Sequence, residues 1–203
     1  MTVEEFFNLL LEELEQRPAI RGYYKFLDQP SSLPFRKAYF CQRLQYVFDQ
    51  VKEHQTKLKG QLPEIWDCGC GYATTQIFLA LNGIPSSGST LEFYYKEIPD
   101  RLDYWKKHGD MDLVRVNYED IFETHVGPES NDIIIVQDTL HHLEPLHESL
   151  RIFQKTLRSG GIVLAVEENG SNLIQRLKLY LRRGNKRIIE FYDEGLGRMV
   201  MMG

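Results

Sequence analysis

A short strand-like run that ends in an acid and a glycine-rich turn constrains the fold of this chain more than any other feature. The segment 64–74 reads Glu-Ile-Trp-Asp-Cys-Gly-Cys-Gly-Tyr-Ala-Thr. An apolar pattern with helical spacing follows over 75–81, and Asn82-Gly83 suits a helix end. Strand, glycine turn and helix form the first half of a nucleotide-type βαβ unit, in which Gly69 and Gly71 let the backbone approach a ligand closely.

Four further strand-like runs follow this unit, with helical patterns between them, at 88–93, 112–117, 131–138 and 162–168. The last two runs have apolar centres rich in β-branched residues, at 133–136 and 162–166, which is typical of strands buried on both faces of a parallel sheet. The alternation predicts an α/β fold, a doubly wound and mostly parallel Rossmann-like sheet with helices on both faces.

The residues before the glycine turn carry two amphipathic helical patterns, at 3–16 and at 35–57. We therefore predict an N-terminal helical extension over 1–58 and a ligand-binding Rossmann-like domain over 59–203. The extension either covers the mouth of the ligand site as a lid or merely packs on one edge of the sheet. In the lid arrangement Arg36, Tyr39 and Arg43 could reach a carboxylate.

The acid in front of the glycine turn separates two kinds of nucleotide-like ligand. A dinucleotide fingerprint has an apolar residue where this chain has Asp67, and a third glycine where it has Thr74. A carboxylate at that place repels a pyrophosphate but attracts a ligand that carries ammonium and sulfonium groups. Glu92 lies at the distance beyond Gly71 at which a βαβ unit delivers a carboxylate to ribose hydroxyls.

Together with the strand 131–138 and the following Leu140-His141-His142-Leu143, these residues resemble the class I S-adenosylmethionine-dependent methyltransferases. The resemblance covers roughly residues 60–170, with four motifs in the family's order, although Tyr72 and Ala73 depart from the usual small residue plus glycine. It implies S-adenosylmethionine as cofactor, with the binding residues Asp67, Gly69, Cys70, Gly71, Glu92, Asn117, Tyr118, Gln137 and Asp138.

The resemblance also implies the reaction, which is methyl transfer to a small-molecule acceptor by in-line displacement. The enzyme chiefly aligns the two reacting centres, so a general base is needed only for some acceptors. His141 and His142 are the candidate bases, and ordering of the loop is the alternative role of His142. The alternative functions are an NAD-dependent oxidoreductase and a non-catalytic scaffold that binds an adenosine ligand. An aromatic lid favours a small, partly apolar acceptor.

The end of the chain contains a basic segment, 176–187, beside an apolar helical face. Its charges either complement a helix dipole or contact an anionic substrate or membrane surface. The segment 187–202 predicts a hairpin. That hairpin either closes the sheet or is an inserted arm of a chain that lacks its true closing strands.

Composition and charge exclude several other classes. The net charge of −5 argues against a nucleic-acid partner bound by bulk electrostatics. No apolar run approaches the length of a membrane span and the N-terminus is acidic, so we expect a cytoplasmic protein. The three cysteines suit a reducing compartment, and Cys68 and Cys70 lack a second pair of ligands, so we expect no metal site.

Overall fold

A five-stranded parallel sheet forms the centre of the computed structural model, which describes residues 1–167, 169, 171–186, 188–193 and 197–202. The strand order is β3-β2-β1-β4-β5, and all four pairings are parallel. The predicted doubly wound sheet is confirmed, and its order reverses between β1 and β4, where open α/β sheets bind ligands. The strands are β1 (Ile65–Cys68), β2 (Ser86–Thr90), β3 (Val114–Tyr118), β4 (Asn131–Gln137) and β5 (Leu157–Val166).

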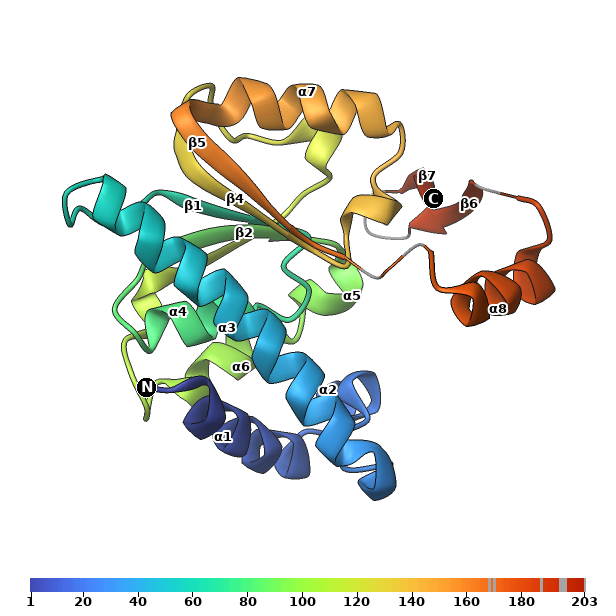
Figure 1. Ribbon diagram of the computed structural model, residues 1–203, viewed down its shortest axis with the longest axis horizontal. Helices are drawn as coiled ribbons and strands as arrows, with labels where there is room; N and C mark the ends of the chain where they lie inside the picture. Colours follow the sequence, from blue (N-terminus) through green and yellow to red (C-terminus); the bar gives the residue numbers. More distant parts are fainter. Residues whose placement is uncertain (168, 170, 187, 194–196, 203) are drawn as a thin grey trace.

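Helices cover both faces of the sheet, as predicted (Figure 1). One face carries α3 (Leu33–Lys57), α4 (Thr74–Ala80) and α6 (Ile98–Trp105), and the other carries α7 (Leu146–Thr156). Successive side chains of a strand point to opposite faces. Ile65 and Ile133 therefore pack with residues of α3 and α4, whereas Trp66 and Ile134 share a cluster with Phe153 of α7.

The N-terminal helices are part of the same hydrophobic core. They are α1 (Val3–Gln16), α2 (Pro18–Tyr24) and α3. A capping box starts α1, because Thr2 accepts from the Glu5 amide and Glu5 accepts from the Thr2 amide. Phe6 is fully buried between Phe78 of α4 and Trp105 of α6. Packing is therefore continuous across residue 58, where the sequence predicts the extension to end.

Some elements begin or end elsewhere than the sequence predicts. Strand β2 ends at Thr90, so Glu92 opens the short helix α5 (Glu92–Tyr95) instead of closing a strand, and its side chain lies outside the described part. The helical pattern between the second and third strand-like runs forms two helices, α5 and α6, since Pro99 lacks an amide proton and stands in the first turn of α6. The remaining short turns are η1 (Pro30–Ser32), η2 (Met111–Leu113), η3 (Ile121–Glu123) and η4 (Leu140–His142).

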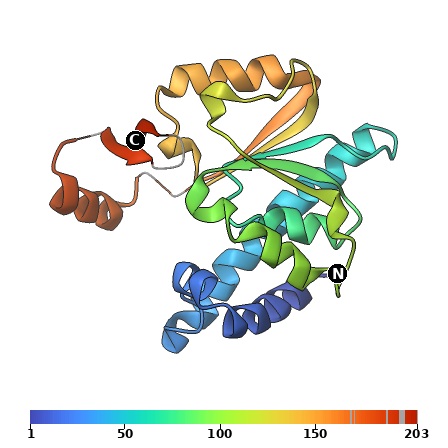
Figure 2. The same ribbon diagram turned by 180° about the vertical axis from the view of Figure 1, so that it is seen from behind.

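After β5 the chain leaves the sheet. Helix α8 (Leu173–Arg183) and the strands β6 (Ile189–Asp193) and β7 (Arg198–Met202) lie to one side of it (Figures 1 and 2). The predicted hairpin is confirmed, but its role in closing the sheet is wrong, because β6 and β7 pair only with each other. The hairpin is held by Arg198, which pairs with Asp120 and Glu123 after β3. None of the described helices is both long and apolar enough to cross a membrane.

Candidate active site

The glycine turn after β1 has an unusual backbone. Gly69, Gly71 and Ala73 all have positive φ, of 77°, 52° and 59°. A Cβ on Gly69 would lie 2.3 Å from Cγ2 of Thr139, so this glycine lets the loop after β4 close onto the turn. A Cβ on Gly71 would meet nothing within 4 Å. Only the second glycine is therefore open toward a ligand.

Asp67 lies at the carboxyl end of β1 and is only 2% exposed. Burial raises the pKa of its carboxyl group to about 7. Its side chain nevertheless lines the cavity in front of the turn. A cation placed in this part of the cavity would favour the ionised form of Asp67. An anion there would disfavour the ionised form further, in addition to the effect of burial.

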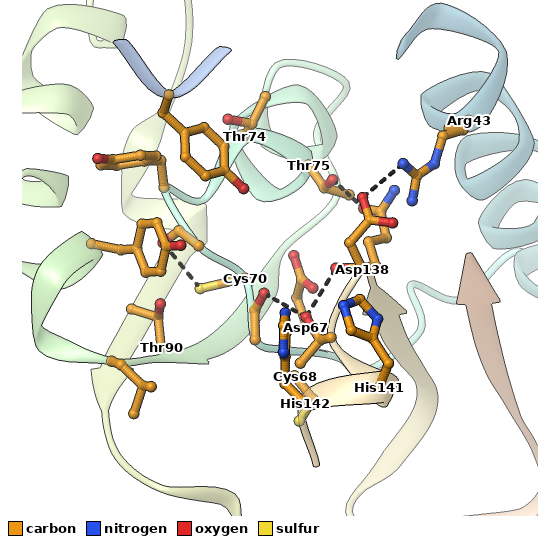
Figure 3. A pocket seen from close by; sticks show the side chains of 18 of the residues that line it. Arg43, Asp67, Cys68, Cys70, Thr74, Thr75, Thr90, Asp138, His141 and His142 are labelled. Carbon is orange, nitrogen blue, oxygen red and sulfur yellow. Dashed lines mark hydrogen bonds and ion pairs between the residues drawn. The ribbon is translucent and has the colours of Figure 1, made fainter. Parts of the chain in front are cut away.

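The carboxyl ends of the strands open into one cavity of about 1410 Å³ (Figure 3). One side is the turn with Asp67, Gly69, Cys70 and Gly71, all of which were predicted to bind cofactor. The opposite wall comes from the N-terminal helices and the segment between them. Its side chains are largely aromatic: Tyr23, Tyr24, Phe26, Phe35, Arg36, Tyr39, Phe40, Arg43 and Leu44.

The loop after β3 contributes residues other than the predicted ones. Asn117 and Tyr118 are not among the described residues that line the cavity, whereas the four residues 119–122 are. Asp120 is 7% exposed and accepts a hydrogen bond from the Phe122 amide at 3.0 Å. The sequence signal for this loop was an Asp that directly follows a strand and can cap a turn. The nearer of the two predicted residues, Tyr118, lies two residues before it.

The end of β4 brings the predicted pair Gln137 and Asp138 to the cavity. Gln137 Oε1 accepts from Thr75 Oγ1 of α4 at 2.5 Å. Asp138 has a φ of 49°, and its Oδ2 accepts from Arg43 Nη1 at 2.7 Å. Arg43 also donates to the carbonyl oxygen of Val166 at 2.7 Å, so one guanidinium joins α3 to both β4 and β5.

Both candidate bases line the cavity (Figure 3), and the carboxylate of Glu167 orients one of them. Glu167 Oε2 lies 2.6 Å from His141 Nδ1, while Oε1 accepts from the amides of Thr139 and Leu140 at 2.9 and 2.7 Å. A carboxylate accepts from Nδ1–H, so in the neutral imidazole the lone pair is then on Nε2. Glu167 therefore orders this loop.

A buried network that sequence reasoning missed ties α1 to the glycine turn. Arg101 of α6 donates to both oxygens of Glu13 in α1 at 2.8 Å, and both side chains are fully buried. It also donates to the Tyr72 carbonyl and to Thr74 Oγ1, each at 2.6 Å. The Tyr24 hydroxyl forms a short hydrogen bond with the same Thr74 oxygen. Charged residues inside amphipathic helices gave no signal that they would be buried.

A cavity at the switch point of a parallel sheet, bordered by a glycine turn and a buried acid, defines a domain that binds a nucleotide-like ligand. Residues 66–165 match the family model described as a methyltransferase domain. This segment belongs to the class I S-adenosylmethionine-dependent methyltransferases. The match confirms the predicted family for this segment, and S-adenosylmethionine is the cofactor of that family.

Solved structures of the same fold come from distant organisms. A candidate sarcosine dimethylglycine methyltransferase from Galdieria sulphuraria is 15% identical, with a TM-score of 0.59 over 82% of this chain and 66% of the other. An S-adenosylmethionine-dependent methyltransferase from Methanosarcina mazei is 17% identical, with a TM-score of 0.53 over 70% and 72%. Geranyl diphosphate C-methyltransferase from Streptomyces coelicolor is 15% identical, with a TM-score of 0.52 over 75% and 60%.

At these identities the likeness shows the fold alone. The chain spans only about half the length of other solved structures that it matches. No curated protein sequence matches it.

Proposed function

We propose that this chain transfers the methyl group of S-adenosylmethionine to a small, partly apolar acceptor by in-line displacement. The observation that carries the proposal is a single cavity that joins the buried Asp67 and the glycine turn to an aromatic wall. Its volume of about 1410 Å³ exceeds the 300–1,000 Å³ or so typical of pockets for one small ligand. The space therefore suits a cofactor and an acceptor side by side.

The residues on the turn side fit the cofactor. Asp67 offers a buried carboxylate to the cationic methionine portion, and Gly71 leaves room for close backbone approach. Gln137 and Asp138 also line the cavity, and we assign them to the methionine end. Bound there, the cofactor supplies an electrophilic methyl group, and the chain supplies alignment and exclusion of water.

The adenosine end of the cofactor site is assigned from position. We assign Glu92 to the ribose hydroxyls from its spacing after Gly71. The loop 119–122 borders the cavity, whereas the predicted cofactor-binding residues Asn117 and Tyr118 are not among its described lining residues. We therefore assign the adenine contact to this loop.

For an acceptor that must lose a proton, we propose His141 as the general base. Its Nδ1 is held by Glu167, which leaves Nε2 to take a proton from the acceptor. His142 lies beside it, with the two ring centroids 4.0 Å apart, and we propose that it orders the turn η4.

Ligand binding tests the proposal first. S-adenosylmethionine and S-adenosylhomocysteine should each raise the melting temperature, since a ligand that binds only the native state stabilises it. NAD should leave the melting temperature unchanged, and stabilisation by NAD alone would reject the proposal. Methyl transfer is then sought over acceptors that differ in apolar size and nucleophilic atom. Cofactor binding without turnover over that panel would favour the non-catalytic scaffold.

The role of His141 is tested by His141→Gln, with His142→Gln as the matched control. With a hydroxyl acceptor we expect His141→Gln to lower kcat by about 10²–10⁴-fold, the usual contribution of a positioned base, without changing cofactor affinity. Glu167→Gln should lower kcat less, because it disturbs the orientation of the base rather than removing it. Equal losses in the two histidine variants would show that η4 as a whole, and not one imidazole, supports the reaction.

A further inference from the structure

Helix α8 exposes an apolar face that nothing in the described structure covers. Leu173 and Leu181 are each 75% exposed, Ile174 is 69% exposed, and Leu177 and Tyr180 are more than half exposed. The helix has only 11 residues. Isolated helices shorter than about 12–15 residues are marginal in water and usually depend on burial of an apolar face. We therefore expect the apolar face of α8 to pack against another apolar surface.

The direction of the face follows from helical geometry. At about 100° per residue, Leu173, Ile174, Leu177, Tyr180 and Leu181 fall within one sector of roughly 120°. Leu179, which lies on the opposite side of the helix, is the half-buried member. The apolar stripe is therefore turned away from the body of the protein, and α8 stands apart from the sheet in both ribbon views (Figures 1 and 2).

The charge of this region is opposite to that of the whole chain. No Asp or Glu occurs from residue 169 to residue 189, although the chain has 29 acids and a net charge of −5. Six of its 24 Lys and Arg lie in the same stretch: Arg176, Lys178, Arg182, Arg183, Lys186 and Arg187. Of these, Arg176, Lys178 and Arg182 are exposed and flank the apolar sector on both sides. An acidic protein thus presents a locally basic, apolar helix.

We propose that α8 lies in the surface of an anionic lipid bilayer, with its apolar stripe at the boundary of headgroups and acyl chains. An apolar sector flanked by Lys and Arg on a helix parallel to the surface is the pattern of interfacial membrane binding. Tyr180 at the edge of the stripe suits the same boundary, because its ring is apolar and its hydroxyl is polar. The following hairpin adds the exposed apolar side chains of Ile188, Tyr192 and Met199.

Helix α8 begins beside the cavity, so a membrane contact through α8 would bring the bilayer close to the candidate site. Asn172 lines the cavity, and its Oδ1 accepts from the Ile174 amide at 3.0 Å in the first turn of α8. A bilayer under α8 would therefore lie beside the cavity. The membrane contact itself is independent of methyl transfer and is measured without cofactor.

Vesicle sedimentation of the 203-residue chain tests the proposal. Vesicles of phosphatidylglycerol and phosphatidylcholine should bind the protein, whereas vesicles of phosphatidylcholine alone should bind it at least about tenfold more weakly. Leu177→Gln with Leu181→Gln should weaken binding by about tenfold or more, because burial of even one leucine is worth about that factor. Lys178→Gln with Arg182→Gln should weaken it by about fivefold for each charge, with a smaller salt dependence.

The control variant is Leu62→Gln, which removes an apolar side chain that is 48% exposed but lies far from α8 in the sequence. It should bind vesicles as the unchanged chain does. All variants should keep the circular dichroism and melting temperature of the parent, since each side chain is exposed. Failure to bind anionic vesicles, or binding that the α8 variants do not change, would overturn the proposal. So would lipid-free dimers that the leucine variant dissociates, because the face would then belong to a second copy.

Discussion

Two arginine–carboxylate pairs join the N-terminal helices to the rest of the domain, and their surroundings are opposite. In the pair of Glu13 and Arg101 both side chains are fully buried, and every nitrogen of the guanidinium donates a hydrogen bond. In the pair of Arg43 and Asp138 the side chains are 15% and 45% exposed at the cavity wall. Arg43 Nε and Asp138 Oδ1 are buried without a hydrogen-bond partner in the described structure.

The difference separates a pair that holds the scaffold from a pair that faces a ligand. A fully satisfied buried network fixes the groups it contacts, here the Tyr72 carbonyl and Thr74 on either side of the turn into α4. Polar atoms left unpaired at a cavity wall cost free energy until a ligand or water satisfies them. We therefore expect Arg101 to govern stability and Arg43 to govern ligand binding.

Replacement of the buried arginine should have the largest effect. Arg101→Met leaves Glu13 buried without its cation and should lower the free energy of unfolding by about 3–5 kcal/mol. Urea denaturation measures this loss as a lower midpoint at an unchanged slope. The double variant with Glu13→Leu should recover part of the loss, because no charge is then stranded. A double variant that is no more stable than the single one would show that the contacts to the glycine turn, not the stranded charge, dominate.

Asp67 is nearly as buried as Glu13, but unlike Glu13 it has no ion pair in the described structure. Burial raises its pKa from 3.8 to about 7. The folded protein thus binds a proton that the unfolded chain releases between these pH values, and the free energy of unfolding falls as pH rises from about 4 to 7. In Asp67→Asn this fall of a few kcal/mol in the free energy of unfolding with rising pH should be absent. The variant should therefore be more stable than the parent at pH 8.

The same substitution should weaken cofactor binding, so stability and binding should change in opposite directions. The thermal shift produced by S-adenosylmethionine measures the second effect at pH 8, where Asp67 is mostly ionised. Cofactor affinity in the parent should rise with pH through about 7, because the ionised carboxylate attracts the cationic cofactor. An unchanged affinity in Asp67→Asn would remove the proposed role of this acid.

The sheet could be predicted from sequence because its signals are local. The run 133–136 is wholly β-branched, which is the composition of a strand buried on both faces of a parallel sheet. Strand and helix ends were less predictable. Ser86 and Ser87 belong to β2 although neither is a typical strand residue, since the neighbours β1 and β3 supply their hydrogen bonds. The detached hairpin was also beyond reach, because its docking depends on Arg198 meeting Asp120 across 78 residues.

The residues of the site likewise divide into those that the sequence predicts and those that it does not. The turn residues Asp67 to Gly71 and the pair Gln137 and Asp138 are contiguous with strand ends, so topology alone brings them together. The aromatic wall was expected only as one of two alternatives, because amphipathic helices can pack on several surfaces. The sequence led us to expect that Arg43 could reach a carboxylate but not which one, and it predicted no partner for Arg101. Which helical charge becomes buried depends on tertiary packing, and the spacing of a single helix does not encode it.

Arg43→Met is the matched counterpart of Arg101→Met and should have the smallest effect on folding. It removes one partly exposed ion pair and a hydrogen bond to the Val166 carbonyl, so the free energy of unfolding should fall by only about 1 kcal/mol. Its larger effect should be on ligands, since Asp138 then faces the cavity without its cation and loses the contact that orients it. Titration calorimetry with S-adenosylhomocysteine, beside urea denaturation, measures both quantities in both variants. The distinction would be wrong if Arg43→Met lost as much stability as Arg101→Met and left ligand affinity unchanged. Both arginines would then stabilise the fold, and neither would contribute to ligand binding.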